Sequence, residues 1–241
     1  MEMMKIGLVG YGRMGREIEK IALERGHTIE LTIDVENYGE LTRENLARCD
    51  VVIEFTAPAS AVDNYLTCFD ANVPVVSGTT GWLQEKERVF DACKQHGGTF
   101  FYASNFSVGV NLFFELNRKL ARLMFPYPDY EAVIGEVHHV KKLDAPSGTA
   151  ITLAEDLVRE IPGKTAWHLG PANQPTEIGV LSERSGEVPG IHTVTSESGD
   201  DLIQITHSAK SRRGFALGAV LAAEFCLHKK GIFTMSDLLN F

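Results

Sequence analysis

A glycine-rich turn near the amino terminus constrains the fold of this chain more than any other feature. The sequence Gly10-Tyr11-Gly12-Arg13-Met14-Gly15 follows the short apolar run 6–9, and apolar residues then recur at helical spacing up to a stop signal at Gly26. In such a unit the three glycines allow a tight turn, a close approach of pyrophosphate to the backbone, and close packing of helix on strand. The helix start adds unpaired amide groups and a partial positive charge. The motif therefore predicts a dinucleotide site.

An acidic residue stands where such a site needs one. Asp34 closes the second predicted strand, 29–33, and lies 34 − 15 = 19 positions after the last glycine. A carboxylate at this place can accept hydrogen bonds from the adenosine ribose. The alternative is a turn that needs glycine for its own geometry, with Asp34 as a solvated charge. Arg13 also has two interpretations: it contacts cofactor phosphate or substrate carboxylate, or it is a first-turn helix residue that faces water.

The first hundred residues alternate between strand and helix patterns. Further strands are predicted at 51–55, 73–76 and 99–102, and a helix at 83–96. Strands separated by helices imply right-handed crossovers. We therefore predict an α/β protein whose first domain, residues 1–104, is a Rossmann-type doubly wound parallel sheet that binds a dinucleotide. We expect the tail, about 213–241, with its small-residue-rich helix at 214–229, to complete this domain.

Strand patterns dominate after residue 105. A helix is predicted at 110–124 and another at 148–160, and strands at 131–139, 177–183, 191–198 and 201–207. Glycine and proline mark the turns between the late strands. This order predicts a mixed or antiparallel sheet with a helix on one face. Residues 105–212 are thus expected to form a second, α+β domain.

Composition excludes several classes of function. The formal net charge of −9 argues against non-specific binding to nucleic acid. No apolar run is long enough to span a bilayer, and no apolar signal segment is present. The four cysteines include no Cys-x-x-Cys pair, so we expect neither a metal site nor disulfides. This pattern of unpaired cysteines fits a reducing compartment and predicts a cytoplasmic protein.

The stretch 136–150 is the most specific part of the chain. His138 and His139 end a strand, Lys142 follows in a turn, and Gly148 and Thr149 begin a helix. Neighbouring strand residues point to opposite faces, so the two histidines cannot have the same role. Amides at the helix start, with the Thr149 hydroxyl, suit a bound carboxylate. The alternative is a solvated basic strand end.

This stretch resembles the signature of the dihydrodipicolinate reductases, also named 4-hydroxy-tetrahydrodipicolinate reductases. The resemblance covers nearly the whole chain, because separate motifs occur in the family's order. They are the glycine-rich turn, Gly78-Thr79-Thr80-Gly81, Asn105-Phe106-Ser107-Val108-Gly109-Val110-Asn111, Arg184-Ser185-Gly186, Gly190-Ile191-His192, and Arg212 with Phe215-Ala216 and Gly218-Ala219.

The resemblance implies reduction of 4-hydroxy-tetrahydrodipicolinate to tetrahydrodipicolinate by NADH or NADPH, in the diaminopimelate route to lysine. It implies that His138 and Lys142 donate protons and that His139, Gly148 and Thr149 bind the dicarboxylate substrate. It also implies a homotetramer built through the second domain's sheet, so that this domain serves substrate binding and oligomerisation. The residues expected at the cofactor are Gly10, Tyr11, Gly12, Arg13, Met14, Gly15, Asp34, Gly78, Thr79, Thr80, Ala103, Ser104, Asn105 and Phe106.

These residue types suit the chemistry. A proton must follow the hydride, and a histidine with an ordinary pKa near neutrality or a positioned lysine can deliver it. The remaining motif residues Arg184, His192 and Arg212 are compatible with a tetramer, hinge or pocket role, and Glu136 is expected to be structural.

The chain departs from the family pattern in ways that bear on the cofactor. Its glycine-rich turn is one residue shorter than in many members, and the chain as a whole is also shorter than many members. Val35 follows Asp34, where members that accept the phosphorylated cofactor often have arginine. Because a carboxylate repels a 2′-phosphate unless a cation is nearby, we predict a preference for NADH.

Two other functions compete with this one. Another two-domain dehydrogenase would act on a sugar, an aldehyde or an amino acid; the semialdehyde type needs a cysteine nucleophile at a strand–helix junction. Cys49 and Cys93 lie in or next to polar helical stretches, which does not suit that role. A non-catalytic dinucleotide sensor would lack a cationic dicarboxylate pocket, and the segment with His138 and Lys142 argues against it.

Overall fold

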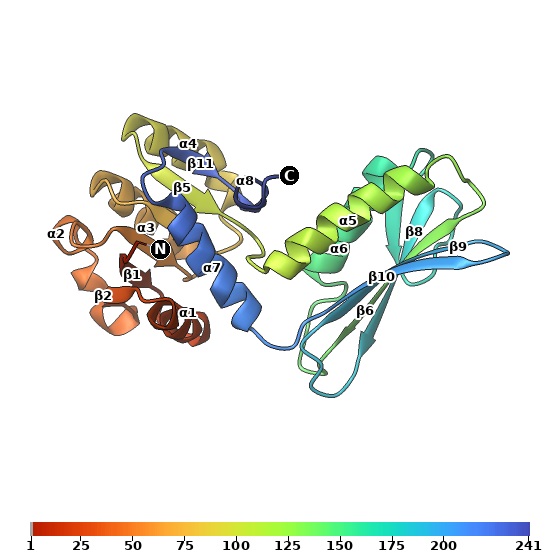
Figure 1. Ribbon diagram of the computed structural model, residues 1–241, viewed down its shortest axis with the longest axis horizontal. Coiled ribbons are helices and arrows are strands. Elements are labelled where there is room, and N and C mark those ends of the chain that lie inside the picture. Colours follow the sequence, from red (N-terminus) through yellow and green to blue (C-terminus); the bar gives the residue numbers. More distant parts are fainter. Residues whose placement is uncertain (1) are drawn as a thin grey trace. The chain divides into compact units, whose positions relative to one another are not determined.

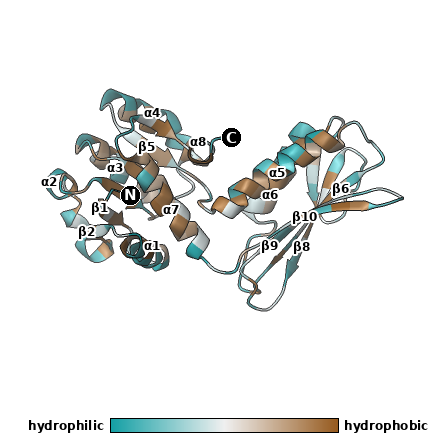
Figure 2. Cartoon of the chain, viewed as in Figure 1, coloured by the Kyte–Doolittle hydropathy of each residue, from teal (hydrophilic) through white to brown (hydrophobic). Residues whose placement is uncertain are grey.

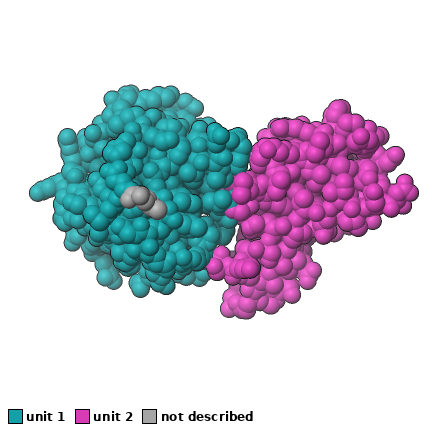
Figure 3. Space-filling model, viewed as in Figure 1, with its two compact units in different colours: residues 1–108, 212–241 teal, residues 109–211 magenta. Residues whose placement is uncertain are grey.

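The structure is a computed structural model that describes residues 2–241. It divides into two compact units (Figure 3). Unit 1 takes in the chain up to Val108 together with Arg212–Phe241, and unit 2 is Gly109–Ser211. The predicted domain borders were 104/105 and 212/213.

Unit 1 is built on a parallel sheet that has six strands within residues 2–241 (Figure 1). In spatial order these are β11 (Gly231–Phe233), β5 (Thr99–Tyr102), β4 (Val75–Ser77), β3 (Val51–Glu54), β1 (Lys5–Val9) and β2 (Thr28–Ile33), and every neighbouring pair is parallel. The chain first winds outward from β1 to β2 and then crosses to β3 on the other side of β1. Loops at such a switch point diverge at the carboxyl ends of the strands and leave room for a ligand.

Helices cover both faces of this sheet. On one face α1 (Arg13–Glu24) and α7 (Arg213–Cys226) pack together, and on the other lie α3 (Pro58–Asp70) and α4 (Lys86–Gln95). Because side chains alternate along a strand, Val51 and Ile53 pack with α1 and α7, whereas Val52 packs with α3. The helix α7 is apolar over most of its surface (Figure 2), which suits its buried position. Smaller elements are η1 (Val35–Glu40), α2 (Arg43–Leu46), η2 (Leu83–Glu85) and α8 (Met235–Leu239).

Unit 2 holds a mixed sheet with helices on one face (Figure 1). Its order is β10 (Leu202–Ser208), β9 (Ile191–Glu197), β6 (Glu131–His138), β8 (Glu177–Arg184) and β7 (Ala166–Leu169). The pairs β6–β8 and β7–β8 are parallel, and β6–β9 and β9–β10 are antiparallel. The helices α5 (Val108–Met124) and α6 (Gly148–Glu160) form a core with the sheet through residues such as Phe113, Leu153 and Ile134.

These two sheets confirm the predicted fold class, and the structure corrects several details. The sequence patterns did not predict η1, α2, α3, β7, β11 or α8. The tail helix predicted at 214–229 is wrong at its carboxyl end. The helix α7 stops at Cys226, and both Leu227 and His228 leave helical geometry. The predicted strand 131–139 ends one residue early, so His139 follows β6.

Candidate active site

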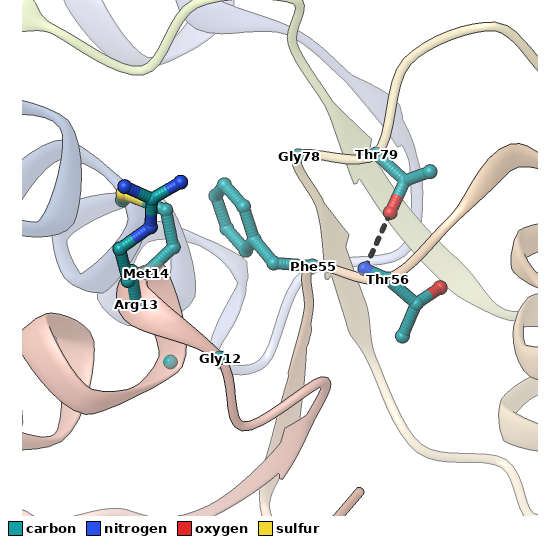
Figure 4. Close-up of a pocket in the computed structure, with 8 residues that line it drawn as sticks. Gly12, Arg13, Met14, Phe55, Thr56, Gly78 and Thr79 are labelled. Atoms are coloured by element: carbon teal, nitrogen blue, oxygen red, sulfur yellow. Dashed lines mark hydrogen bonds between the residues drawn. The ribbon is translucent and has the colours of Figure 1, made fainter. Parts of the chain in front are cut away.

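Unit 1 has a pocket at the switch point of its sheet (Figure 4). Its volume is about 260 Å³. It is lined by Gly12, Arg13, Met14, Gly15, Phe55, Thr56, Gly78 and Thr79. All except Phe55 and Thr56 are residues that the sequence predicts at the cofactor. Those two follow β3 directly, and their place at the carboxyl end of a buried strand beside β1 is the signal that could have found them.

The glycine-rich turn has the shape that a pyrophosphate needs. Gly10 has φ +94°, and a Cβ there would lie 2.0 Å from the carbonyl oxygen of Phe55, so only glycine fits. A Cβ on Gly12 would meet nothing within 4 Å in the described chain, so this backbone is open to a ligand. Among the described residues, no side chain caps the start of α1. Its first amides are therefore available to an anion.

Other predicted cofactor residues lie around this turn. The Tyr11 hydroxyl donates a hydrogen bond to Glu19, and the Arg16 guanidinium lies 5.2 Å from the Tyr11 ring centroid. Asp34 follows β2 and caps η1, where its carboxylate accepts a hydrogen bond of 2.7 Å from the Val35 amide. The sequence of η1, Val-Glu-Asn-Tyr-Gly-Glu, carries acidic side chains and no lysine or arginine.

A buried carboxylate holds two of the loops that line the pocket. Glu54, at the end of β3, is fully buried and accepts hydrogen bonds from the Thr56 amide at 3.1 Å, the Thr79 hydroxyl at 2.9 Å and the Ser77 hydroxyl at 2.8 Å. The Thr79 hydroxyl in turn accepts from the Thr56 amide at 2.8 Å, the dashed bond in Figure 4. Burial raises the pKa of Glu54, while these hydrogen bonds oppose that rise. The carboxylate thus fixes the carboxyl ends of β3 and β4 together.

The remaining predicted cofactor residues lie in the loop after β4 and in the loop after β5. Thr80, in the loop after β4, is exposed, as is Ser104, while Ala103 and Asn105 are half-buried. Phe106 is 2% exposed, and its ring stacks on Phe101 with centroids 5.8 Å apart. Because this side chain belongs to the core, Phe106 can offer a cofactor only its backbone.

Unit 2 gathers charged and imidazole side chains at one end of its sheet. The register places Glu136 opposite Ser182 on β8 and opposite His192 on β9, and places His138 opposite Arg184. Of these residues only His138 was predicted in the site. Arg184 and His192, for which the sequence leaves tetramer, hinge or pocket roles open, are not predicted in the site, because pairing between strands distant in the sequence carries no local signal.

Glu136 is the centre of this cluster. It is 1% exposed, and its two oxygens each lie 3.1 Å from the Ser147 amide, with a further hydrogen bond of 2.6 Å from the Ser182 hydroxyl. The nearest nitrogen of Arg184 lies 3.5 Å away. Burial raises the pKa of Glu136, but the neighbouring His192, Ser147 and Ser182 outweigh burial and hold the pKa well below its ordinary range. The group is an anion.

His138 is buried beside this anion. It is 7% exposed, and its ring centroid lies 5.0 Å from that of His192. Burial is the largest cause that lowers its pKa to about 4, and the positive charges of Lys142 and Arg184 add to it, while Glu136 opposes them. In the unliganded protein this imidazole is therefore neutral at pH 7.

The other predicted site residues lie in the turn that follows. The Lys142 ammonium donates to both carboxylate oxygens of Asp144, each at 2.8 Å. His139 is half-buried, and its Nδ1 is sealed from solvent with no hydrogen-bond partner in the described chain. Ser147 caps α6 by accepting from the Ala150 amide at 3.2 Å. The amides of Gly148 and Thr149 meet no acceptor within residues 2–241, so the start of α6 can receive a carboxylate.

Three of these groups also meet the spacing of metal ligands. One ligand atom each from Glu136, His138 and His192 lie within 4.8 Å of one another. Both oxygens of Glu136 already accept hydrogen bonds, and the Arg184 guanidinium lies 3.5 Å away. A cation at that distance repels a metal ion, so the cluster is better suited to an anionic ligand.

The thiols offer no nucleophile. All four cysteines are free and buried, and burial raises the pKa of Cys49 and of Cys93 to about 11. A thiol with such a pKa is protonated at pH 7, whereas a catalytic cysteine needs its thiolate. Within the described residues, no helix combines the length and apolar character that crossing a membrane requires.

Comparison with known proteins gives the family. The family model described as "Dihydrodipicolinate reductase, N-terminus" matches residues 4–106, and the one described as "Dihydrodipicolinate reductase, C-terminus" matches residues 109–239. A 4-hydroxy-tetrahydrodipicolinate reductase of Christiangramia forsetii is 51% identical over 98% of both chains. One of Methanosarcina barkeri is 40% identical over 86% of this chain and 78% of its own.

A solved structure supports the fold. The dipicolinate-bound dihydrodipicolinate reductase of Paenisporosarcina sp. TG-14 is 22% identical, with a TM-score of 0.78 over 98% of this chain and 99% of its own. At this identity the likeness shows only the architecture. The family follows from the two family models, which together span almost the whole chain. The chain belongs to the dihydrodipicolinate reductase family.

Proposed function

We propose that this protein is a 4-hydroxy-tetrahydrodipicolinate reductase, which forms tetrahydrodipicolinate in the diaminopimelate route to lysine. The observation that carries the proposal is the stretch with His138, Lys142 and the amides of Gly148 and Thr149, which meet no acceptor within residues 2–241, in a chain 51% identical to a reductase of that name. The substrate is a cyclic dicarboxylate, and this cluster offers a cation, a proton carrier and a helix start within one short stretch.

The reductant is a pyridine nucleotide, and unit 1 is its binding domain. The open backbone of Gly12 and the start of α1 would hold its pyrophosphate, and Asp34 its adenosine ribose. The loops 78–80 and 103–106 would contact the rest of the cofactor, with Thr79 fixed through Glu54. When bound, the cofactor supplies the hydride, and the protein supplies position and charge.

The protein's part in the chemistry is to bind two carboxylates and move one proton. Lys142, released from Asp144, and the amides of Gly148 and Thr149 would hold the carboxylates, with His139 as a further contact. A bound dianion offsets the positive charges that add to burial in keeping His138 neutral, so its pKa rises on binding and the imidazole takes up a proton. The protonated His138, with Lys142 beside it, can then neutralise the negative charge left by the hydride.

The segment after Asp34 supports a preference for NADH. A 2′-phosphate would approach a carboxylate and an η1 segment whose charged side chains are acidic. Family members that accept the phosphorylated cofactor often have an arginine where this chain has Val35. The adenosine ribose of NADH instead offers hydroxyl groups that can donate hydrogen bonds to the Asp34 carboxylate.

The sheet of unit 2 supports a homotetramer. On the face opposite α5 and α6, the strands expose apolar side chains, with Val133 36% and Leu181 44% exposed. Apolar residues on an open sheet face are typical of contacts between subunits. The four free cysteines support a reducing, cytoplasmic location.

One assay tests the reaction and the cofactor together. The unstable substrate is generated in place from pyruvate and aspartate semialdehyde by its synthase, and oxidation of NADH and of NADPH is followed separately. We expect oxidation that depends on the synthase, with the higher kcat/KM for NADH. Folded, cofactor-bound protein that oxidises neither would exclude the reaction, and a kcat/KM clearly higher for NADPH would exclude the preference.

A further inference from the structure

Glu136 has contacts that a purely structural carboxylate does not need. Hydrogen bonds from the Ser147 amide and the Ser182 hydroxyl already join the start of α6 to β6 and β8. In addition, its Oε2 lies 3.5 Å from Nδ1 of His138 and 3.6 Å from Nε2 of His192. The same anion therefore faces two imidazoles that lie edge to face on neighbouring strands.

The nitrogen of His138 that faces Glu136 has no other partner. Its Nδ1 is sealed from solvent and makes no hydrogen bond within the described residues. A separation of 3.5 Å is too long for a good hydrogen bond, but bonds of catalytic groups are often loose without substrate and tighten in the complex. If Nδ1 carries its proton toward Glu136, Nε2 on the far side of the ring is left for a ligand.

We propose that Glu136 is a positioning residue for the reduction: its carboxylate accepts a hydrogen bond from Nδ1–H of His138 in the substrate complex and leaves Nε2–H to deliver the proton that follows the hydride. This inference rests on the proposed function. The His192 ring lies against the same carboxylate and hydrogen-bonds Ser147 at 3.0 Å, so it helps to hold Glu136 in place.

The charges around His138 explain why the carboxylate is needed. The titratable groups that face it are Glu136 on its own strand, His192 on β9, Arg184 on β8 and Lys142 in the following turn. A bound dicarboxylate offsets Lys142 and Arg184, and Glu136 stays ionised because its neighbours hold its pKa low. The imidazolium then interacts with two anions, which are Glu136 at Nδ1 and the bound substrate.

The test compares the wild type with Glu136→Gln, which keeps the size and most of the hydrogen bonds but removes the charge. The pH profile of kcat reports the proton donor in the enzyme–substrate complex. We expect the alkaline limb of that profile to move to lower pH by roughly 1 to 3 units, since that is the effect of one opposite charge at this distance. At pH 7.5, kcat should fall by about 10²-fold.

A matched control separates positioning from loss of stability. Asp156, on α6 in the same unit, is 3% exposed and pairs with Arg118 and Arg159. Asp156→Asn therefore also neutralises a buried carboxylate and should lower the melting temperature, but it should leave the alkaline limb in place. Glu136→Asp, which retains the charge, should return the limb toward the wild-type position. If Glu136→Gln is recovered unfolded, Glu136→Asp replaces it in the test. Its alkaline limb should then move in the same direction, but by less.

A second measurement needs no turnover. Pyridine-2,6-dicarboxylate mimics the flat dianionic substrate, and calorimetry in buffers of different ionisation enthalpy counts the protons taken up on binding. We expect uptake by the wild type at pH 7 and clearly less by Glu136→Gln. Equal uptake, or an alkaline limb shared by both proteins, overturns the role of Glu136 while the proposed function stands. If the wild type shows no substrate-dependent oxidation, the proposed function is overturned. The calorimetric proton count then still tests whether Glu136 promotes proton uptake on binding of the dicarboxylate.

Discussion

The imidazole of His138 links stability to pH at the scale of a single residue. Burial and nearby cations lower its pKa from 6.5 to about 4 in the folded protein. Between these two values the unfolded chain binds a proton that the folded chain does not. Stability from this group is therefore present above pH 6.5 and is lost as the pH falls toward 4, by about 2 kcal/mol between pH 7 and pH 5.

His138→Gln should remove this pH dependence. Unfolding in urea at pH 7 and at pH 5 measures the two free energies of unfolding, and the variant should lose about 2 kcal/mol less than the wild type over that interval. His228→Gln is the control, because the side chain of His228 is 74% exposed. It should follow the wild type. A variant at position 138 with the wild-type pH dependence would show that this imidazole is not kept neutral by the fold.

At the scale of elements, α7 depends on one glycine. A Cβ on Gly218 would lie 1.7 Å from the carbonyl oxygen of Phe106, the residue that ends the loop 103–106. Helix and loop must move apart to accept Gly218→Ala. We expect a loss of about 1 to 3 kcal/mol in the free energy of unfolding, together with weaker binding of NADH, since the displaced loop contacts the cofactor in our proposal.

The same helix provides the control for that substitution. At Gly214 an added Cβ would have its nearest contact 3.7 Å away, at the Ser107 hydroxyl. Gly214→Ala should therefore raise the free energy of unfolding by about 0.5 kcal/mol, because alanine loses less backbone entropy in a helix. Urea unfolding and NADH titration of both variants measure the contrast. Equal stability of the two would contradict the close packing of α7 on Phe106.

Periodicity predicted most elements of both units, and the missed ones have physical reasons. Pro58 ends the apolar strand pattern after β3, yet proline is tolerated in the first turn of a helix and here begins α3. Apolar residues after it recur at helical spacing, such as Ala61, Tyr65 and Phe69, and this pattern indicates the helix. The strand β11 has only three residues and pairs with β5 alone at the sheet edge, so its local pattern is weak.

The candidate site was predictable where its residues are contiguous and unpredictable where they are not. The glycine-rich turn and the stretch from His138 to Thr149 form local motifs. Phe55 joins the pocket only because β3 lies beside β1. Glu136 and His192 meet only through the antiparallel register of β6 and β9, which no single segment encodes.

At the scale of the whole molecule, the exposed face of the second sheet should hold the tetramer together. Light scattering should give about four times the chain mass of 26.6 kDa for the wild type. Leu181→Asp places a charge on that face and should yield smaller species. Leu123→Asp, at an exposed position of α5, is the control and should keep the wild-type mass. A wild-type monomer would contradict the assembly and leave the reaction untouched.

The most direct test of the assigned active site compares two adjacent lysines in the synthase-coupled assay. Lys142 lies in the candidate site, whereas Lys141 is exposed and pairs with Glu187 at 3.3 Å. We predict that Lys142→Ala lowers substrate-dependent oxidation of NADH by about 10²-fold or more, since it removes a carboxylate contact and a proton carrier. Lys141→Ala should retain wild-type activity. If both variants, shown to be folded and to bind NADH, turn over at the wild-type rate, the reaction does not take place at the site assigned to it.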